Sequence, residues 1–216
     1  MRAILTISLL LLFLTLPALP VLSQALNLGE FEAGRLNGWE PELFEGETQY
    51  QLVRKGEFMA LEGRSEASAS GLVKKLEIDI NRYPHLNWSW MATRILQGNE
   101  ERIKEGDDFP VRLYVVVSGG IFFWQTRALN YVWTRNQPVG SHWPNPFTGN
   151  AIMLAVESGE QRLNQWVSYK RNVKEDLKRY LGMEVDKVHA VALMVDTDNT
   201  GQAALSFFRD ITFTEN

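Results

Sequence analysis

Paired carboxylates and one arginine are the residues whose types and spacing could support chemistry. Asp107 and Asp108 precede an apolar strand pattern in which Arg112 and Tyr114 alternate with aliphatic residues. Paired carboxylates can shift each other's pKa for acid–base work, or they can hold a hard cation. Because neighbouring residues of an extended strand point apart, turn chemistry with an ion pair to Arg112 is the favoured interpretation.

A second acidic cluster follows the apolar run 188–195. Asp196, Asp198 and Asn199 belong to a six-residue stretch that ends at Gly201, and acids at the first and third positions with glycine at the sixth resemble the start of a calcium loop. The twelfth position is Phe207 in place of the bidentate Glu. We therefore predict a polar turn. A structural calcium held by these three residues, or direct contact with a ligand, are the alternatives, and no other cofactor is predicted.

Aromatic residues gather around an irregular segment, residues 134–150, which is rich in Pro and Gly. Long irregular connections are often functional, although this one could also pack its own aromatic residues over the core. Aromatic rings flanked by Asn, Asp and Arg suit sugars, which stack on rings and need polar partners. The candidate ligand-binding residues are Asp107, Asp108, Arg112, Tyr114, Trp124, Asn130, Trp133, His142, Trp143 and Asn145.

Catalytic motifs are scarce. The chain has three His and no Cys, and it contains neither a Gly-x-Ser-x-Gly elbow nor a His-Glu-x-x-His pair. The leading hypothesis is a non-catalytic binding module for a saccharide or another cell-envelope ligand. One alternative is a polysaccharide hydrolase or lyase that uses Asp107 or Asp108, Arg112 and His142. Another is a structural envelope protein with a flat apolar patch for a partner.

The elements that must position these residues are mostly strands. Val111, Leu113 and Val115 alternate with Arg112 and Tyr114, and many short period-two segments separated by Gly, Asn, Asp and Pro predict an antiparallel β-sandwich of jelly-roll, galactose-binding-like type. Leu86, Trp88 and Trp90 share one predicted core face. One short helix is expected after a cap at Asn172, ending before Gly182.

The N-terminus predicts export. A positive start, the apolar run 3–16 and the small residues Ser23 and Ala25 indicate a signal peptide over residues 1–25, followed by a single sandwich domain over residues 26–216. The run is shorter than the 20 or so residues of a membrane span, so no stable span is expected after removal of the signal. A net charge of −4 argues against a nucleic-acid partner. The expected location is periplasmic or secreted.

Several phrases in order resemble one family. They include Phe31-Glu32-Ala33-Gly34, Val111-Arg112-Leu113-Tyr114, Ala128-Leu129-Asn130-Tyr131, Pro144-Asn145-Pro146-Phe147 and the stretch from Met194 to Gly201. The set resembles the exported bacterial family DUF3047, a domain family of unknown function. The resemblance implies a bacterial source, an envelope or secreted location and a single module. It implies no catalytic residue.

Overall fold

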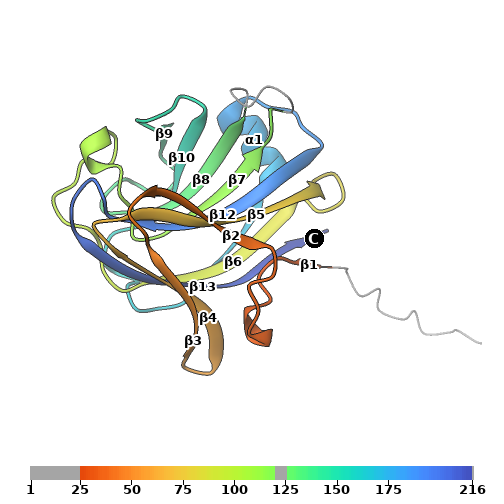
Figure 1. Cartoon of the computed structure of the whole chain (residues 1–216). Helices are drawn as coiled ribbons and strands as arrows, with labels where there is room; N and C mark the ends of the chain where they lie inside the picture. Colours follow the sequence, from red (N-terminus) through yellow and green to blue (C-terminus); the bar gives the residue numbers. More distant parts are fainter. Residues whose placement is uncertain (1–24, 120–125, 216) are drawn as a thin grey trace, which may run out of the picture.

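The computed structural model describes residues 25–119 and 126–215, which form two β-sheets packed face to face (Figure 1). The strands are β1 (Leu26–Asn27), β2 (Trp39–Glu45), β3 (Gln49–Lys55), β4 (Phe58–Glu66), β5 (Ala69–Asp79), β6 (His85–Ala92), β7 (Arg112–Val117), β8 (Arg127–Thr134), β9 (His142–Pro144), β10 (Ala151–Ser158), β11 (Val167–Asn172), β12 (Lys187–Asp196) and β13 (Ala203–Thr214). Single 3-10 turns span Phe31–Ala33 and Lys104–Gly106.

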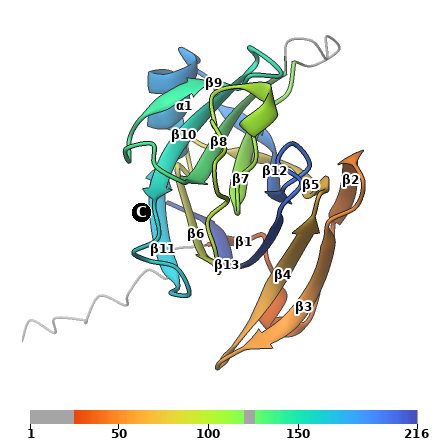
Figure 2. The same cartoon turned by 90° about the vertical axis from the view of Figure 1, so that its left-hand side faces the viewer.

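The six-stranded sheet has the order β11-β6-β13-β4-β3, and β1 also pairs with β13. The seven-stranded sheet has the order β2-β5-β12-β7-β8-β10-β9. Figures 1 and 2 show the two layers crossing over one another, with the β3–β4 hairpin extending away from the rest of the fold. This architecture confirms the predicted all-β sandwich.

Alternating apolar residues fill the space between the sheets. Leu113 and Val115 of β7 and Trp88 and Trp90 of β6 are buried in one hydrophobic cluster. The Trp88 ring stacks on that of Tyr131 from the opposite sheet, with centroids 5.1 Å apart. The predicted core faces of β6 and β7 are therefore confirmed, because period-two alternation leaves each strand one aliphatic side to hide from water.

The helix α1 (Val173–Leu181) begins and ends where the sequence predicts. The Asn172 side chain accepts a hydrogen bond from the Glu175 backbone N–H at 3.1 Å, and Gly182 ends the helix in the left-handed region at φ 66°. Val173 and Leu177 are buried in the main core. The Tyr131 hydroxyl donates to Asp176 at 2.8 Å, which links the helix to β8.

One strand pair departs from the antiparallel expectation. β8 and β10 run parallel, with Ala151 opposite Ala128 and Leu154 opposite Tyr131. A parallel pair cannot be joined by a tight turn and needs a long crossover connection. The irregular segment 134–150 is that connection, and part of it forms β9, which pairs antiparallel with β10.

Among the described residues, none of the helices is long and apolar enough to cross a membrane. The predicted signal peptide lies almost entirely in residues 1–24, outside the described part of the chain.

Candidate functional site

A cavity of about 350 Å³ opens on the outer face of the seven-stranded sheet, away from the core. In the register of the sheet, Arg112 lies opposite Met194 of β12, and Tyr114 lies opposite Asn130 of β8. These side chains point outward because their strand neighbours, including Leu113, point into the core. The cavity is lined by Phe44, Ala69, Asp107, Arg112, Tyr114, Asn130, Asn145, Phe147, Thr148, Ala151, Met194, Asp196, Asp198 and Asn199.

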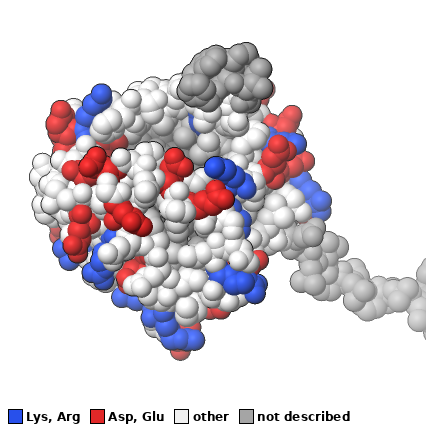
Figure 3. All heavy atoms as spheres, viewed as in Figure 1, with Lys and Arg blue, Asp and Glu red and all other residues white. Residues whose placement is uncertain are grey.

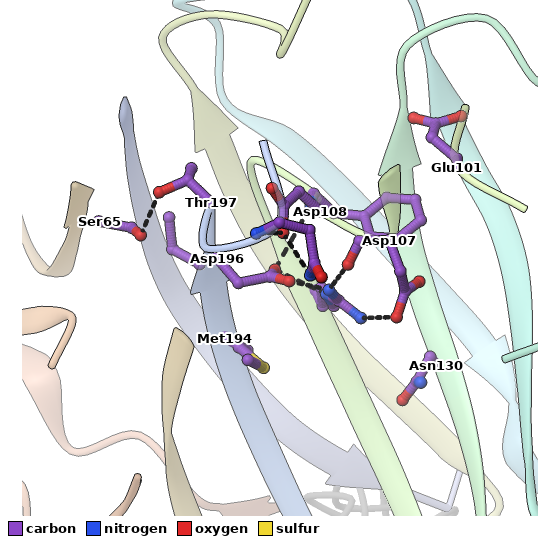
Figure 4. Close-up of polar contacts among 12 residues, drawn as sticks. Ser65, Glu101, Asp107, Asp108, Asn130, Met194, Asp196 and Thr197 are labelled. Carbon is purple, nitrogen blue, oxygen red and sulfur yellow. Dashed lines mark hydrogen bonds and ion pairs between the residues drawn. The ribbon is translucent and has the colours of Figure 1, made fainter. Parts of the chain in front are cut away.

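Arg112 is the centre of a buried ion-pair network at the floor of this cavity. Its side chain is only 4% exposed. Nε donates to Asp196 Oδ1 at 2.7 Å, and Nη2 donates to the Asp107 carbonyl and contacts the second Asp196 oxygen. Nη1 donates to Asp107 Oδ2 at 3.4 Å, so the predicted ion pair with Asp107 is confirmed. Figure 4 shows Asp107 and Asp196 reaching the network from opposite sides.

Asp107 and Asp108 point in different directions, as expected for sequence neighbours. Asp107 faces Arg112 and also accepts from Asn145 Nδ2 at 2.7 Å. Burial raises the pKa of Asp107 above its ordinary value, although Arg112 and Asn145 lower it. Asp108 is fully buried and contacts the loop after β12. The two carboxylates therefore do not act on one common point in the cavity.

The loop after β12 is the polar turn that the sequence predicts. Asp108 accepts from the Asn199 backbone N–H at 3.3 Å, from Asn199 Nδ2 at 3.1 Å and from the Thr200 N–H at 2.7 Å. Gly201 closes the turn at φ 65°, where a β-carbon would be strained, and its N–H donates to the Thr197 carbonyl. Thr197 in turn shares a hydrogen bond of 2.7 Å with Ser65 of β4, which fixes the turn to the other sheet (Figure 4).

Two of the three predicted calcium ligands, Asp196 and Asp198, lie near each other, and the third carboxylate beside them is that of Asp108. One carboxylate oxygen from each of Asp108, Asp196 and Asp198 lies within 4.8 Å of the other two. Asn199 instead donates its side-chain amide to Asp108. Asp196 already receives the Arg112 guanidinium, and Asp108 already receives backbone N–H groups. A cation would have to compete with these internal donors.

Two buried oxygen atoms at the cavity floor have no hydrogen-bond partner among the described residues. They are Asp107 Oδ1 and Asn130 Oδ1. Asn130 Nδ2 donates to a thioether, Met153 Sδ at 3.1 Å, which is a weak acceptor. Figure 4 places Asn130 beside Asp107, on the side away from Asp108. Unpaired buried acceptors are rare in folded proteins, and each needs a physical account.

Two phenylalanines at the cavity were missed at the sequence level. Phe44 of β2 is 66% exposed, and Phe147 of the crossover segment is 55% exposed. Met194 and Thr148 also line the cavity without having been predicted. No local pattern separates an exposed Phe from the many buried ones, although the position of Phe147 in a Pro-rich loop was a usable signal.

The predicted tryptophan platform is wrong at two of its three positions. Trp133 is fully buried in the main core, and its Nε1 donates to the Gly159 carbonyl at 3.0 Å. Trp143 is buried in a small second core, where its ring lies 6.4 Å from that of Phe109. Neither ring offers a free face to a ligand. Trp124 lies outside the described residues.

His142 is placed apart from the cavity. Its ring is exposed and lies 5.0 Å from the ring of Tyr180 on α1, and it does not line the cavity. The structure therefore brings together Asp107, Arg112, Tyr114, Asn130 and Asn145 with the acidic turn. The acid–arginine–histidine set considered for an enzyme does not assemble among the described residues.

Comparison with known proteins fixes the family. A family model described as "Protein of unknown function (DUF3047)" matches residues 37–212. The chain belongs to this family. No curated protein matches the sequence.

Among solved structures, the chain is similar to a family 11 carbohydrate-binding module of the cellulosomal cellulase Lic26A-Cel5E of Clostridium thermocellum. Identity is 8% and the TM-score 0.48, covering 88% of this chain and 93% of that one. It is also similar to the xyloglucanase domain of NopAA, a type three effector from Sinorhizobium fredii, in complex with cellobiose. Identity is 12% and the TM-score 0.46, covering 82% and 92%.

A third similar structure is the enzymatically active domain of the bacteriophage CBA120 tailspike protein 4. Here identity is 7% and the TM-score 0.44, covering 88% of this chain and 21% of that one. Likenesses of this strength do not tell what the chain binds.

Proposed function

We propose that this protein is a non-catalytic binding module that holds a saccharide of the bacterial cell envelope in the cavity of the seven-stranded sheet. One observation carries the proposal: unpaired acceptor oxygens of Asp107 and Asn130 lie at the floor of a cavity whose rim holds exposed phenyl rings of Phe44 and Phe147. A sugar combines hydroxyl donors with an apolar C–H face. The cavity offers a complement to each.

The size of the cavity fits a small ligand. Pockets that bind small molecules run from about 300 Å³ upward, and they join apolar walls to a few fixed polar groups. Here Tyr114 and Met194 form part of the wall, and the ion-pair network fixes the polar groups beneath them. The carboxylates of Asp107 and Asp196 are each held by at least one internal donor, so this part of the site is rigid before a ligand arrives, which lowers the entropic cost of binding.

The same contacts favour binding over hydrolysis. A glycosidase of the common type needs two carboxyl groups that flank the scissile bond and are free to exchange protons with it. In this cavity both oxygens of Asp196 contact Arg112, while Asp107 is shared between Arg112 and Asn145. Carboxylates whose oxygens are held by internal donors in this way are not free to reach the two sides of a scissile bond.

The proposal includes export. Cleavage after Ala25 would release a chain that begins at Leu26, the first residue of β1. Mass spectrometry of the protein purified from the periplasm or medium of a Gram-negative host should give a mature N-terminus at Leu26. An intact Met1 on the cell-associated protein would contradict export.

Isothermal titration with an array of envelope polysaccharides and their oligosaccharides tests the binding function. Phe147→Ala should weaken the binding of a retained saccharide by roughly 2- to 12-fold, the equivalent of the 0.5–1.5 kcal/mol typical of an aromatic stacking contact. Phe58→Ala is the matched control, because Phe58 is also exposed but does not line the cavity. The proposal fails if no saccharide binds at millimolar concentration, or if the two variants behave alike.

A further inference from the structure

The Arg112 and Asn145 donors of the cavity floor are already used inside the protein. Every nitrogen of the Arg112 guanidinium donates to Asp107 or Asp196. Asn145 Nδ2 donates to Asp107 as well. An anionic ligand group, such as a carboxylate, sulfate or phosphate, would need such donors and would find them occupied.

Two hydrogen-bond acceptors of the cavity floor, in contrast, are unpaired within the described part of the chain. Asp107 and Asn130 are 3% and 1% exposed, and one oxygen of each has no partner among the described residues. Both residues line the cavity. Rotation about the terminal χ2 torsion of Asn is soft and the Asn130 amide donates to a weak thioether acceptor, so a small turn presents the Asn130 oxygen to a ligand.

The charge of the cavity is also unbalanced. Three carboxylates line it, those of Asp107, Asp196 and Asp198, against the single guanidinium of Arg112. The pKa of Asp198 is raised by its burial and by the neighbouring Asp108, as expected where negative charges crowd together. Further acids lie outside: Glu42 and Glu45 of β2 are exposed, and Figure 3 shows acidic side chains across the face where β2 runs.

Unpaired acceptors and excess negative charge both favour a positively charged hydrogen-bond donor. We propose that the cavity selects a saccharide that carries a free primary ammonium group, with the ammonium against Asp107 and Asn130 and the sugar face on Phe147. This inference rests on the proposed function. An ammonium supplies three donors for the two unpaired oxygens and offsets the excess negative charge. An N-acetylated sugar lacks that charge, and an acidic sugar adds to the repulsion.

The test compares oligosaccharides of equal length by isothermal titration at pH 6. A glucosamine oligosaccharide should bind at least tenfold more tightly than its N-acetylated counterpart, and a uronic acid oligosaccharide should not bind measurably. Putrescine, a diamine without a sugar ring, should bind more weakly than the glucosamine oligosaccharide. Raising the salt concentration should reduce the preference for the charged sugar, because screening weakens the interaction between charges.

Two variants locate the effect. Asp107→Asn should reduce the preference for the charged sugar to less than threefold. Asp198→Asn should reduce the preference for the charged sugar by at least twofold. Asp198 is partly exposed and lines the cavity, so this variant serves as the test if Asp107→Asn does not fold. Glu57→Gln is the control, since Glu57 is an exposed acid in the β3–β4 hairpin and does not line the cavity; its preference should equal that of the unaltered protein.

The outcomes separate the two proposals. Equal or tighter binding of the N-acetylated or acidic sugar overturns the ammonium inference while the saccharide-binding function stands. Binding of putrescine as tight as that of the sugar also overturns it, because the ring then contributes nothing. Absence of binding by all three saccharides overturns both.

Discussion

Replacing Arg112 with Met should destabilise the fold strongly. Arg112 is 4% exposed and gives donors to two buried carboxylates. Without it, the donors that remain among the described residues are the Phe109 backbone N–H, 3.4 Å from Asp196, and the Asn145 amide on Asp107. Breaking a buried ion pair by removing one partner costs about 3–5 kcal/mol, because a charge is left uncompensated in the interior. For a chain of this size that corresponds to a fall in Tm of roughly 6–20 °C.

The effect should depend on pH in a defined direction. Burial already raises the folded-state pKa of Asp107, and loss of the guanidinium, which lowers that pKa, raises it further. The folded variant then binds more protons than the unfolded chain at mildly acidic pH, so its stability falls as pH rises through the raised pKa of Asp107. The difference in free energy of unfolding between the unaltered protein and Arg112→Met should therefore be larger at pH 8 than at pH 5.

Urea unfolding followed by tryptophan fluorescence measures these quantities. Arg64→Met is the matched control, because Arg64 is 47% exposed and lies 3.7 Å from its partner Glu62, a geometry worth less than about 1 kcal/mol. The double variant Arg112→Met with Asp196→Asn should recover part of the loss, since it removes one uncompensated charge. If Arg112→Met and Arg64→Met lose the same free energy, the network around Arg112 is not structural and the reasoning is refuted.

Two further predictions concern acidic groups. Burial raises the pKa of Glu101, which is 1% exposed, to about 7. The folded chain therefore binds this proton more tightly than the unfolded chain does. The resulting stabilisation is complete below the unfolded pKa near 4.5 and is lost as pH rises to about 7, a change of about 3 kcal/mol in the free energy of unfolding. Glu101→Gln should flatten the stability profile between pH 4.5 and 7, whereas Glu100→Gln at the exposed neighbour should not, and identical profiles would contradict the assignment. In the turn after β12, Arg112 holds Asp196, and backbone N–H groups hold Asp108. A calcium chelator should therefore leave Tm unchanged. A fall in Tm that calcium reverses and magnesium does not would show instead that the turn holds an ion.

Local patterns in the sequence determined most of the architecture. Alternation in residues 111–117 fixed which side of β7 faces the core, and the cap at Asn172 with Gly182 fixed the bounds of α1. Both features depend on residues a few positions apart, where the backbone geometry alone decides which side chains share a face. Strands β2, β5 and β11 lacked a clear apolar alternation and were not predicted. Pro41 is tolerated because β2 is an edge strand, which pairs on one side only. The Lys pair in β5 is tolerated because Lys74 is half-buried and Lys75 is exposed.

Only the tertiary structure decided the content of the cavity. From the sequence, Arg112 could face solvent or a concave surface, and the segments folded over the sheet made it a buried group paired with a residue 84 positions away. The same coverage buried Trp143 in the second core and left Phe44 and Phe147 exposed at the rim, whereas Trp133 is buried between the two sheets. Exposure depends on which distant segments meet above a given strand face. That meeting is set by the parallel β8–β10 crossover and the β12 turn, which no pattern of neighbouring residues records.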